Sequence, residues 1–143
     1  MTAGAGIAGA AGRHALARFA FAAVASVFVG CLIVQVFLVG LDIFGEAEAS
    51  THRDFAYVYG WLTPVLILLA GFAQAPKQTR QLTIVLVVLF AIQISLPSLK
   101  DAFPVLAALH PVNALAIFAV AMLIARQAIN LVRPPPTERA TEA

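Results

Sequence analysis

Four long runs of apolar residues, separated by short polar segments, restrict the possible folds of this chain more than any other feature. The runs cover approximately residues 19–41, 55–73, 80–96 and 103–126. Each is near the length of roughly 20 residues that an α-helix needs to cross the hydrocarbon core of a bilayer. With 62% hydrophobic and only 11% charged residues, the composition also differs from that of a soluble domain. We therefore predict an all-α integral membrane protein, a four-helix antiparallel bundle.

The first apolar run has one competing interpretation, a cleaved signal peptide. Such a peptide has an apolar core of about 7–15 residues before a small-residue cleavage site. This run continues through Phe28 and Val34, well past the only plausible site near Ala25. We therefore expect an uncleaved first helix within a transmembrane domain of residues 13–131. A flexible segment, 1–12, should precede this domain, and a disordered cytoplasmic tail, 132–143, should follow it.

The distribution of lysine and arginine predicts the orientation. Arg53 and Lys100 fall on one side of the four runs, and seven basic residues fall on the other. These seven are Arg13, Arg18, Lys77, Arg80, Arg126, Arg133 and Arg139. Because cytoplasmic loops are enriched in basic residues, we predict a multi-pass protein of the bacterial inner (plasma) membrane with both termini in the cytoplasm.

The partners expected from this pattern are the lipid bilayer and further membrane subunits, either in a homo-oligomer or in a larger complex. The basic residues are dispersed along the ends of the runs and form no single patch, so we expect no nucleic-acid partner.

Two glutamine–histidine pairs recur with the same spacing. Gln35 and His52 each lie 58 residues before Gln93 and His110. In a chain with three histidines we interpret this register as a duplicated αα-hairpin, with a pseudo-two-fold axis along the membrane normal. His52 and His110 would then face each other at similar depth. The alternative is that His52 only ends an external loop.

Polar residues are concentrated in the outward halves of the predicted spans. Gln35, Gln93, His110 and Asn113 lie there, and we predict an outward-facing pocket lined by these residues and Tyr59. His110 lies on a seam of alanines that repeats every seven residues in the fourth run, so it should point into the bundle. The simpler alternative is that these side chains only hydrogen-bond neighbouring helices to one another.

Three strings carry a resemblance to a known family. They are Phe37–Gly45, His52-Arg53 with Tyr59-Gly60, and Leu109–Leu115. They resemble the patterns of an uncharacterised, domain-of-unknown-function family of small four-span bacterial membrane proteins, a resemblance that extends from the first helix to Arg126. It implies the fold and no activity. A looser architectural similarity, to transmembrane b-type cytochromes and one half of haem A synthase, implies haem held by histidines on neighbouring helices.

Three classes of function remain open. One is a protein that binds haem b for electron transfer, with His52 and His110 as iron ligands and with Arg53 and Lys100 pairing with the propionates. The second is a non-catalytic structural or assembly subunit, and the third is a small-molecule carrier or binder. The sequence has no phosphate-binding glycine loop, no Gly-x-Ser-x-Gly or His-Glu-x-x-His motif, and no carboxylate deep inside a span. It therefore favours a non-enzyme without deciding the question.

Overall fold

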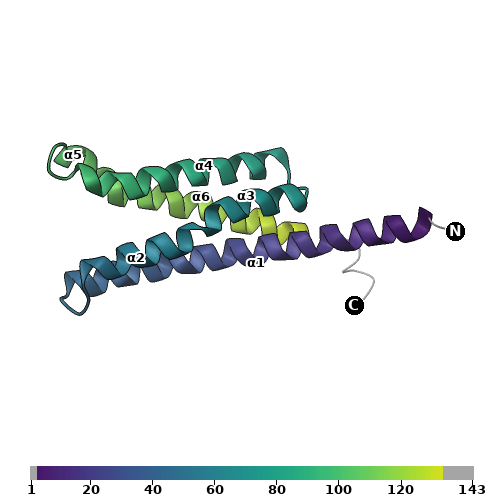
Figure 1. The fold of residues 1–143 in the computed structure, drawn as a ribbon, viewed down its shortest axis with the longest axis horizontal. Coiled ribbons are helices and arrows are strands. Elements are labelled where there is room, and N and C mark those ends of the chain that lie inside the picture. The colour runs from purple at the N-terminus through teal and green to yellow at the C-terminus, as the bar shows by residue number, and fades with distance from the viewer. Residues whose placement is uncertain (1–2, 134–143) are drawn as a thin grey trace.

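The structure, a computed structural model, describes residues 3–133 as four helical spans packed into a bundle (Figure 1). The first span is α1 (Ala3–Ile43), and the second consists of α2 (Ala49–Gly60) and α3 (Leu62–Phe72). The third is α4 (Lys77–Ser95) continued by the 3-10 turn η1 (Leu96–Leu99), and the fourth consists of α5 (Pro104–Ala107) and α6 (Leu109–Val132). Each span packs on the next along the chain, and α6 closes the ring against α1. The predicted all-α four-helix bundle is confirmed.

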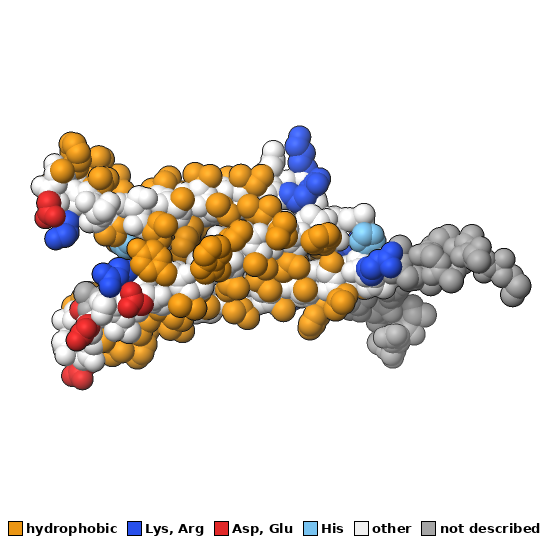
Figure 2. Space-filling model, in the orientation of Figure 1, with side chains coloured by type: hydrophobic (Ala, Val, Ile, Leu, Met, Phe, Trp, Pro, Cys, Tyr) orange, Lys and Arg blue, Asp and Glu red, His pale blue; other side chains and the backbone are white. Residues whose placement is uncertain are grey.

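All four spans are long and apolar enough to cross a membrane. They are Gly12–Ile43, Ser50–Phe72, Lys77–Leu99 and Pro104–Val132. The protein is thus a multi-pass membrane protein. Most of its visible surface is hydrophobic (Figure 2), which suits helices that face lipid on their outer sides.

The structure describes part of each predicted terminal segment. Helix α1 begins at Ala3, inside the segment 1–12 that we expected to be flexible, because alanine is the strongest helix former and dominates this stretch. Most of the predicted tail, residues 134–143, lies outside the described residues.

The centre of the bundle is filled by aromatic rings from three spans. Phe28 of α1 meets Tyr59 of α2 at a ring-centroid distance of 5.5 Å and Phe90 of α4 at 6.3 Å. The Tyr59 and Phe90 rings are 5.6 Å apart. All three contacts are edge-to-face, the arrangement that aromatic quadrupoles favour. We call these three residues the aromatic layer.

The second span is broken where a proline removes a helical hydrogen bond. Pro64 has no N–H to donate to the carbonyl of Gly60, four residues earlier. The hydroxyl of Thr63 donates to that carbonyl instead, at 2.9 Å. Helix α2 ends at this point. Before this break α2 packs on α1, and after it α3 packs on both α1 and α4.

The two ends of the bundle are therefore unlike. At the loop end, formed by the turns 44–48 and 100–103, hairpin 1 (α1–α3) separates from hairpin 2 (α4–α6) (Figure 1). At the opposite, terminal end, basic side chains of α1 close the C-terminus of α3. His14 Nδ1 donates to the carbonyl of Phe72 at 3.2 Å, and Arg18 Nε donates to that of Ala73 at 3.3 Å. These bonds satisfy carbonyls that the end of a helix leaves free.

Candidate functional site

In hairpin 2, His110 is held at both ring nitrogens by a single residue. Its Nδ1 donates to the backbone carbonyl of Gln93 at 3.1 Å, and its Nε2 accepts from the side-chain amide of the same residue at 3.1 Å. Because a carbonyl only accepts, Nδ1 must carry the proton, which leaves the Nε2 lone pair to accept.

Asn113 completes this network. Its amide nitrogen donates to Gln93 Oε1 at 2.7 Å and to the carbonyl of Leu89 at 2.9 Å. We call the group Gln93, His110 and Asn113 the clasp, since it ties α4 to α6. Both polar side-chain atoms of Gln93 and both ring nitrogens of His110 therefore have partners inside an apolar bundle.

Pro97 makes the clasp possible. In a continuous helix the carbonyl of Gln93 would accept the N–H of the residue four positions later. That residue is Pro97, which has no N–H. Helix α4 accordingly ends at Ser95 and gives way to η1. The released carbonyl is the one that accepts from His110.

In hairpin 1 the corresponding pair is bonded differently. Gln35 Nε2 donates to the backbone carbonyl of His52 at 2.8 Å, across the same 17-residue separation as the Gln93–His110 bonds. Within the described part of the chain, Gln35 Oε1 and His52 Nδ1 are both buried and have no hydrogen-bond partner. We call Gln35 and His52 the open pair.

The sequence explains the difference between the two hairpins. The position equivalent to Pro97 in hairpin 1 is Val39, which has an N–H, so the helix continues and the Gln35 carbonyl keeps its usual donor. The position equivalent to Asn113 is Phe55, which offers no hydrogen bond. The spacing of the pairs therefore repeats, but their bonding does not.

The structure places His52 inside helix α2. The helix begins at Ala49, so His52 lies in its first turns and not in the preceding turn. Arg53 bonds to Asp54 at 3.2 Å, and these side chains are 61% and 66% exposed. Lys100 likewise pairs with its neighbour Asp101 at 3.5 Å. The two cations expected at the rim thus lie at the loop end, each beside an acidic partner.

The predicted pocket residues fall into three groups: the clasp, the open pair and Tyr59. Tyr59 is buried in the aromatic layer, with the ring of Phe55 at 5.2 Å. Figure 2 shows histidine surface at the base of the notch where the two hairpins separate.

The residues as arranged do not fit haem held by two histidines. An iron ligand needs a free lone pair on a ring nitrogen, and the one lone pair of His110 accepts from Gln93. The described residues contain no group of three or more metal-binding side chains. Of the two imidazoles, only that of His52 has a buried ring nitrogen without a partner.

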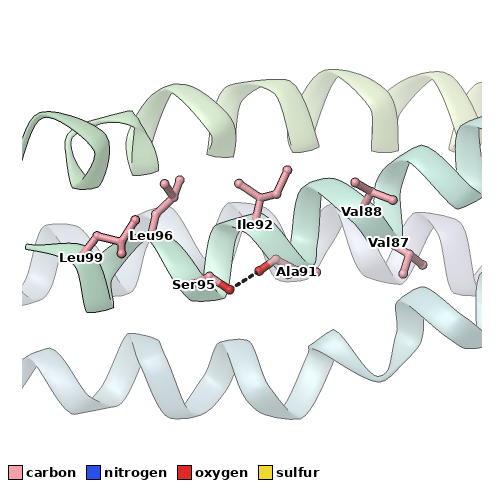
Figure 3. Close-up of a pocket in the computed structure, with 7 residues that line it drawn as sticks. All are labelled: Val87, Val88, Ala91, Ile92, Ser95, Leu96 and Leu99. Atoms are coloured by element: carbon pink, nitrogen blue, oxygen red, sulfur yellow. Dashed lines mark hydrogen bonds between the residues drawn. The ribbon is translucent and has the colours of Figure 1, made fainter. Parts of the chain in front are cut away.

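Two surface hollows lie away from the histidines. The first, of about 520 Å³, is lined by apolar residues of α4 and η1: Val87, Val88, Ala91, Ile92, Leu96 and Leu99, with Ser95 (Figure 3). The Ser95 hydroxyl donates to the Ala91 carbonyl at 2.8 Å, so the hollow suits lipid chains. The second, of about 310 Å³ at the terminal end, is lined by Pro76, Gln78, Thr79, Gln127, Asn130 and Leu131. There Thr79 donates to Gln127 at 2.6 Å.

Pro97 and Leu89 were not expected to contribute to the site. A proline four residues after an intramembrane glutamine is a readable signal, because it frees that glutamine's carbonyl. No comparable signal in the sequence identifies the carbonyl of Leu89.

Comparison with known proteins adds a family and no activity. Neither the curated proteins nor the solved structures contain a match to this chain. The matching family model covers residues 35–99, which include both residues of the open pair and Gln93 but not the string 109–115. Residues 35–99 thus match DUF6220, a family of unknown function, and over this segment the predicted resemblance to an uncharacterised membrane-protein family is confirmed.

Proposed function

We propose that this protein is a non-catalytic binder of small molecules in the membrane, in which the open pair receives the ligand and the clasp is structural. One observation carries the proposal: Gln35 Oε1 and His52 Nδ1 are buried without a partner. A buried polar atom that makes no hydrogen bond costs free energy, about 1–3 kcal/mol in proteins. A ligand that bonds to these two atoms would recover that cost.

The clasp supports this division of roles. A purely structural function accounts for Gln93, His110 and Asn113, whose bonds join two helices. It does not account for Gln35 and His52, each of which has a buried polar atom without a hydrogen-bond partner. A haem held by both histidines would have to break the clasp, so the proposed ligand engages hairpin 1 alone.

We also propose that the loop end faces the outside of the membrane. The described acidic residues all belong to this end, whereas the terminal end carries basic residues such as Arg18, Lys77 and Arg80. Basic residues favour the cytoplasmic side. The ligand would then reach the open pair from the outer half of the bilayer, where the hairpins separate.

Mass spectrometry of copurified small molecules tests the proposal. The protein would be isolated in lipid nanodiscs, extracted with organic solvent, and compared with His52→Phe and Gln35→Leu. His14→Phe is the matched control, because His14 lies at the terminal end. We expect a stoichiometric component in wild type and in the control that is depleted in both open-pair variants. An extract that is the same in all four proteins would refute the proposal.

A further inference from the structure

We infer that the ligand of the open pair is a neutral, lipid-soluble molecule that presents a hydroxyl group to Gln35 and His52. This inference rests on the proposed function and adds the chemical class of the ligand.

Hydrogen-bond chemistry excludes most polar groups. Gln35 Oε1 can only accept, so the ligand must donate to it. Ethers, esters, ketones and carboxylates have no donor and leave this atom unsatisfied. His52 Nδ1 either donates or accepts, according to its tautomer. A hydroxyl both donates and accepts, so it can donate to Gln35 Oε1 while its oxygen accepts from His52 in the tautomer that carries the proton on Nδ1.

The two atoms belong to residues that a hydrogen bond already joins. Gln35 Nε2 bonds the His52 carbonyl at 2.8 Å. This bond uses the amide nitrogen of Gln35, so the amide oxygen is the atom that remains for a ligand. One small polar head group could therefore form hydrogen bonds with both residues.

The surroundings favour a neutral head group. The nearest charged side chains in sequence, Arg53 and Asp54, are exposed and bonded to each other. Among the described residues, no charged side chain is buried in the bundle. An ammonium or a carboxylate at this depth would lack a counter-charge, which is costly inside a membrane.

The rest of the ligand should be apolar. Below the open pair lie Phe55 and the aromatic layer, and the faces around them are hydrophobic. Two sources would supply such a hydroxyl: a phenol on an aromatic ring, or an alcohol on an aliphatic lipid. The aromatic neighbours suit the first by ring packing, but the hydrogen-bond chemistry is shared.

Matched probes distinguish these cases. Protein with ¹⁵N-labelled histidine rings would be placed in nanodiscs and titrated with a long-chain para-alkylphenol or its methyl ether, and with a long-chain primary alcohol or its methyl ether. The readout is the ring-nitrogen signal of His52 against the mole fraction of probe in the bilayer. The signals of His14 and His110 are internal controls, and assignment comes from single His→Phe variants.

We expect the hydroxyl probes to shift the His52 signal and the methyl ethers to do so about tenfold more weakly, as loss of one hydrogen bond predicts. Gln35→Leu should weaken the response to the hydroxyl probes to a similar extent. A stronger response to the phenol would identify an aromatic source, and a stronger response to the alcohol an aliphatic one.

Equal responses to hydroxyl and ether would overturn the inferred class while leaving a binding site in place. The inferred class also fails if no probe shifts the His52 signal although the copurified component depends on His52. If there is neither a probe response nor such a component, the proposed function itself fails.

Discussion

Replacing each glutamine by leucine should have unequal consequences in the two hairpins, although the residues occupy equivalent positions. Leucine has a similar size, so the change removes hydrogen bonds with little change in volume. Gln93→Leu leaves His110 Nε2 without its donor and Asn113 without one of its acceptors. Gln35→Leu removes a single bond to a helical carbonyl and deletes an oxygen that already lacks a partner.

The magnitudes follow from the number of bonds lost. Hydrogen bonds between membrane helices contribute about 0.6 kcal/mol on average and at most about 1.7 kcal/mol. Two such bonds are lost in Gln93→Leu, so the free energy of unfolding should fall by about 1–3 kcal/mol. In Gln35→Leu the carbonyl of His52 keeps its helical donor, and removal of a buried orphan oxygen offsets the loss. We expect a change of less than about 0.5 kcal/mol there.

Reversible unfolding by sodium dodecyl sulfate in mixed micelles, followed by circular dichroism, measures both values. The two variants should be compared with wild type at the same protein and detergent concentrations. Equal destabilisation by the two substitutions, or a larger effect of Gln35→Leu, would refute the assignment of the clasp as structural and of the open pair as unsatisfied.

Other predictions concern packing, backbone conformation and haem. Gly60→Ala should destabilise the bundle by about 1–3 kcal/mol, because the added Cβ would lie 2.6 Å from Phe90 Cε1. The control Gly30→Ala should not destabilise it, because a Cβ there meets nothing within 4 Å. Equal effects of the two substitutions on the free energy of unfolding would contradict the packing. Gln74→Gly should raise the thermal midpoint, since Gln74 has a φ of 53° and the left-handed region costs other residues about 1–2 kcal/mol; a lower midpoint would contradict this. The reduced absorption spectrum should lack the sharp band of bis-histidine haem, and its presence would show that His110 is free of the clasp.

Hydropathy was sufficient to predict the four spans, because lipid exposure imposes long apolar runs whatever their detailed packing. The sequence also singled out Gln35, His52, Gln93 and His110 as polar residues within the spans, and each glutamine does bond to the histidine of its own hairpin.

The division of the predicted pocket residues into the clasp and the open pair could not be predicted in the same way. It depends on which carbonyls lose their helical donors, and so on Pro97 in hairpin 2 and Val39 in hairpin 1. The hydrogen bonds of His14 and Arg18 could not be predicted from the sequence either. They bond the carbonyls of Phe72 and Ala73, contacts that exist only once α1 and α3 are packed together.

The most direct test of the account is the state of the two intramembrane histidines in one ¹⁵N spectrum, recorded before and after the copurified small molecules are extracted. We predict that His110 stays in the single tautomer with the proton on Nδ1 and does not respond to extraction, because both its ring nitrogens are bonded to Gln93. His52 should change its ring-nitrogen shifts on extraction, because the proposed partner of its Nδ1 is lost. A His110 signal that responds while that of His52 stays constant would contradict the assignment of the two pairs.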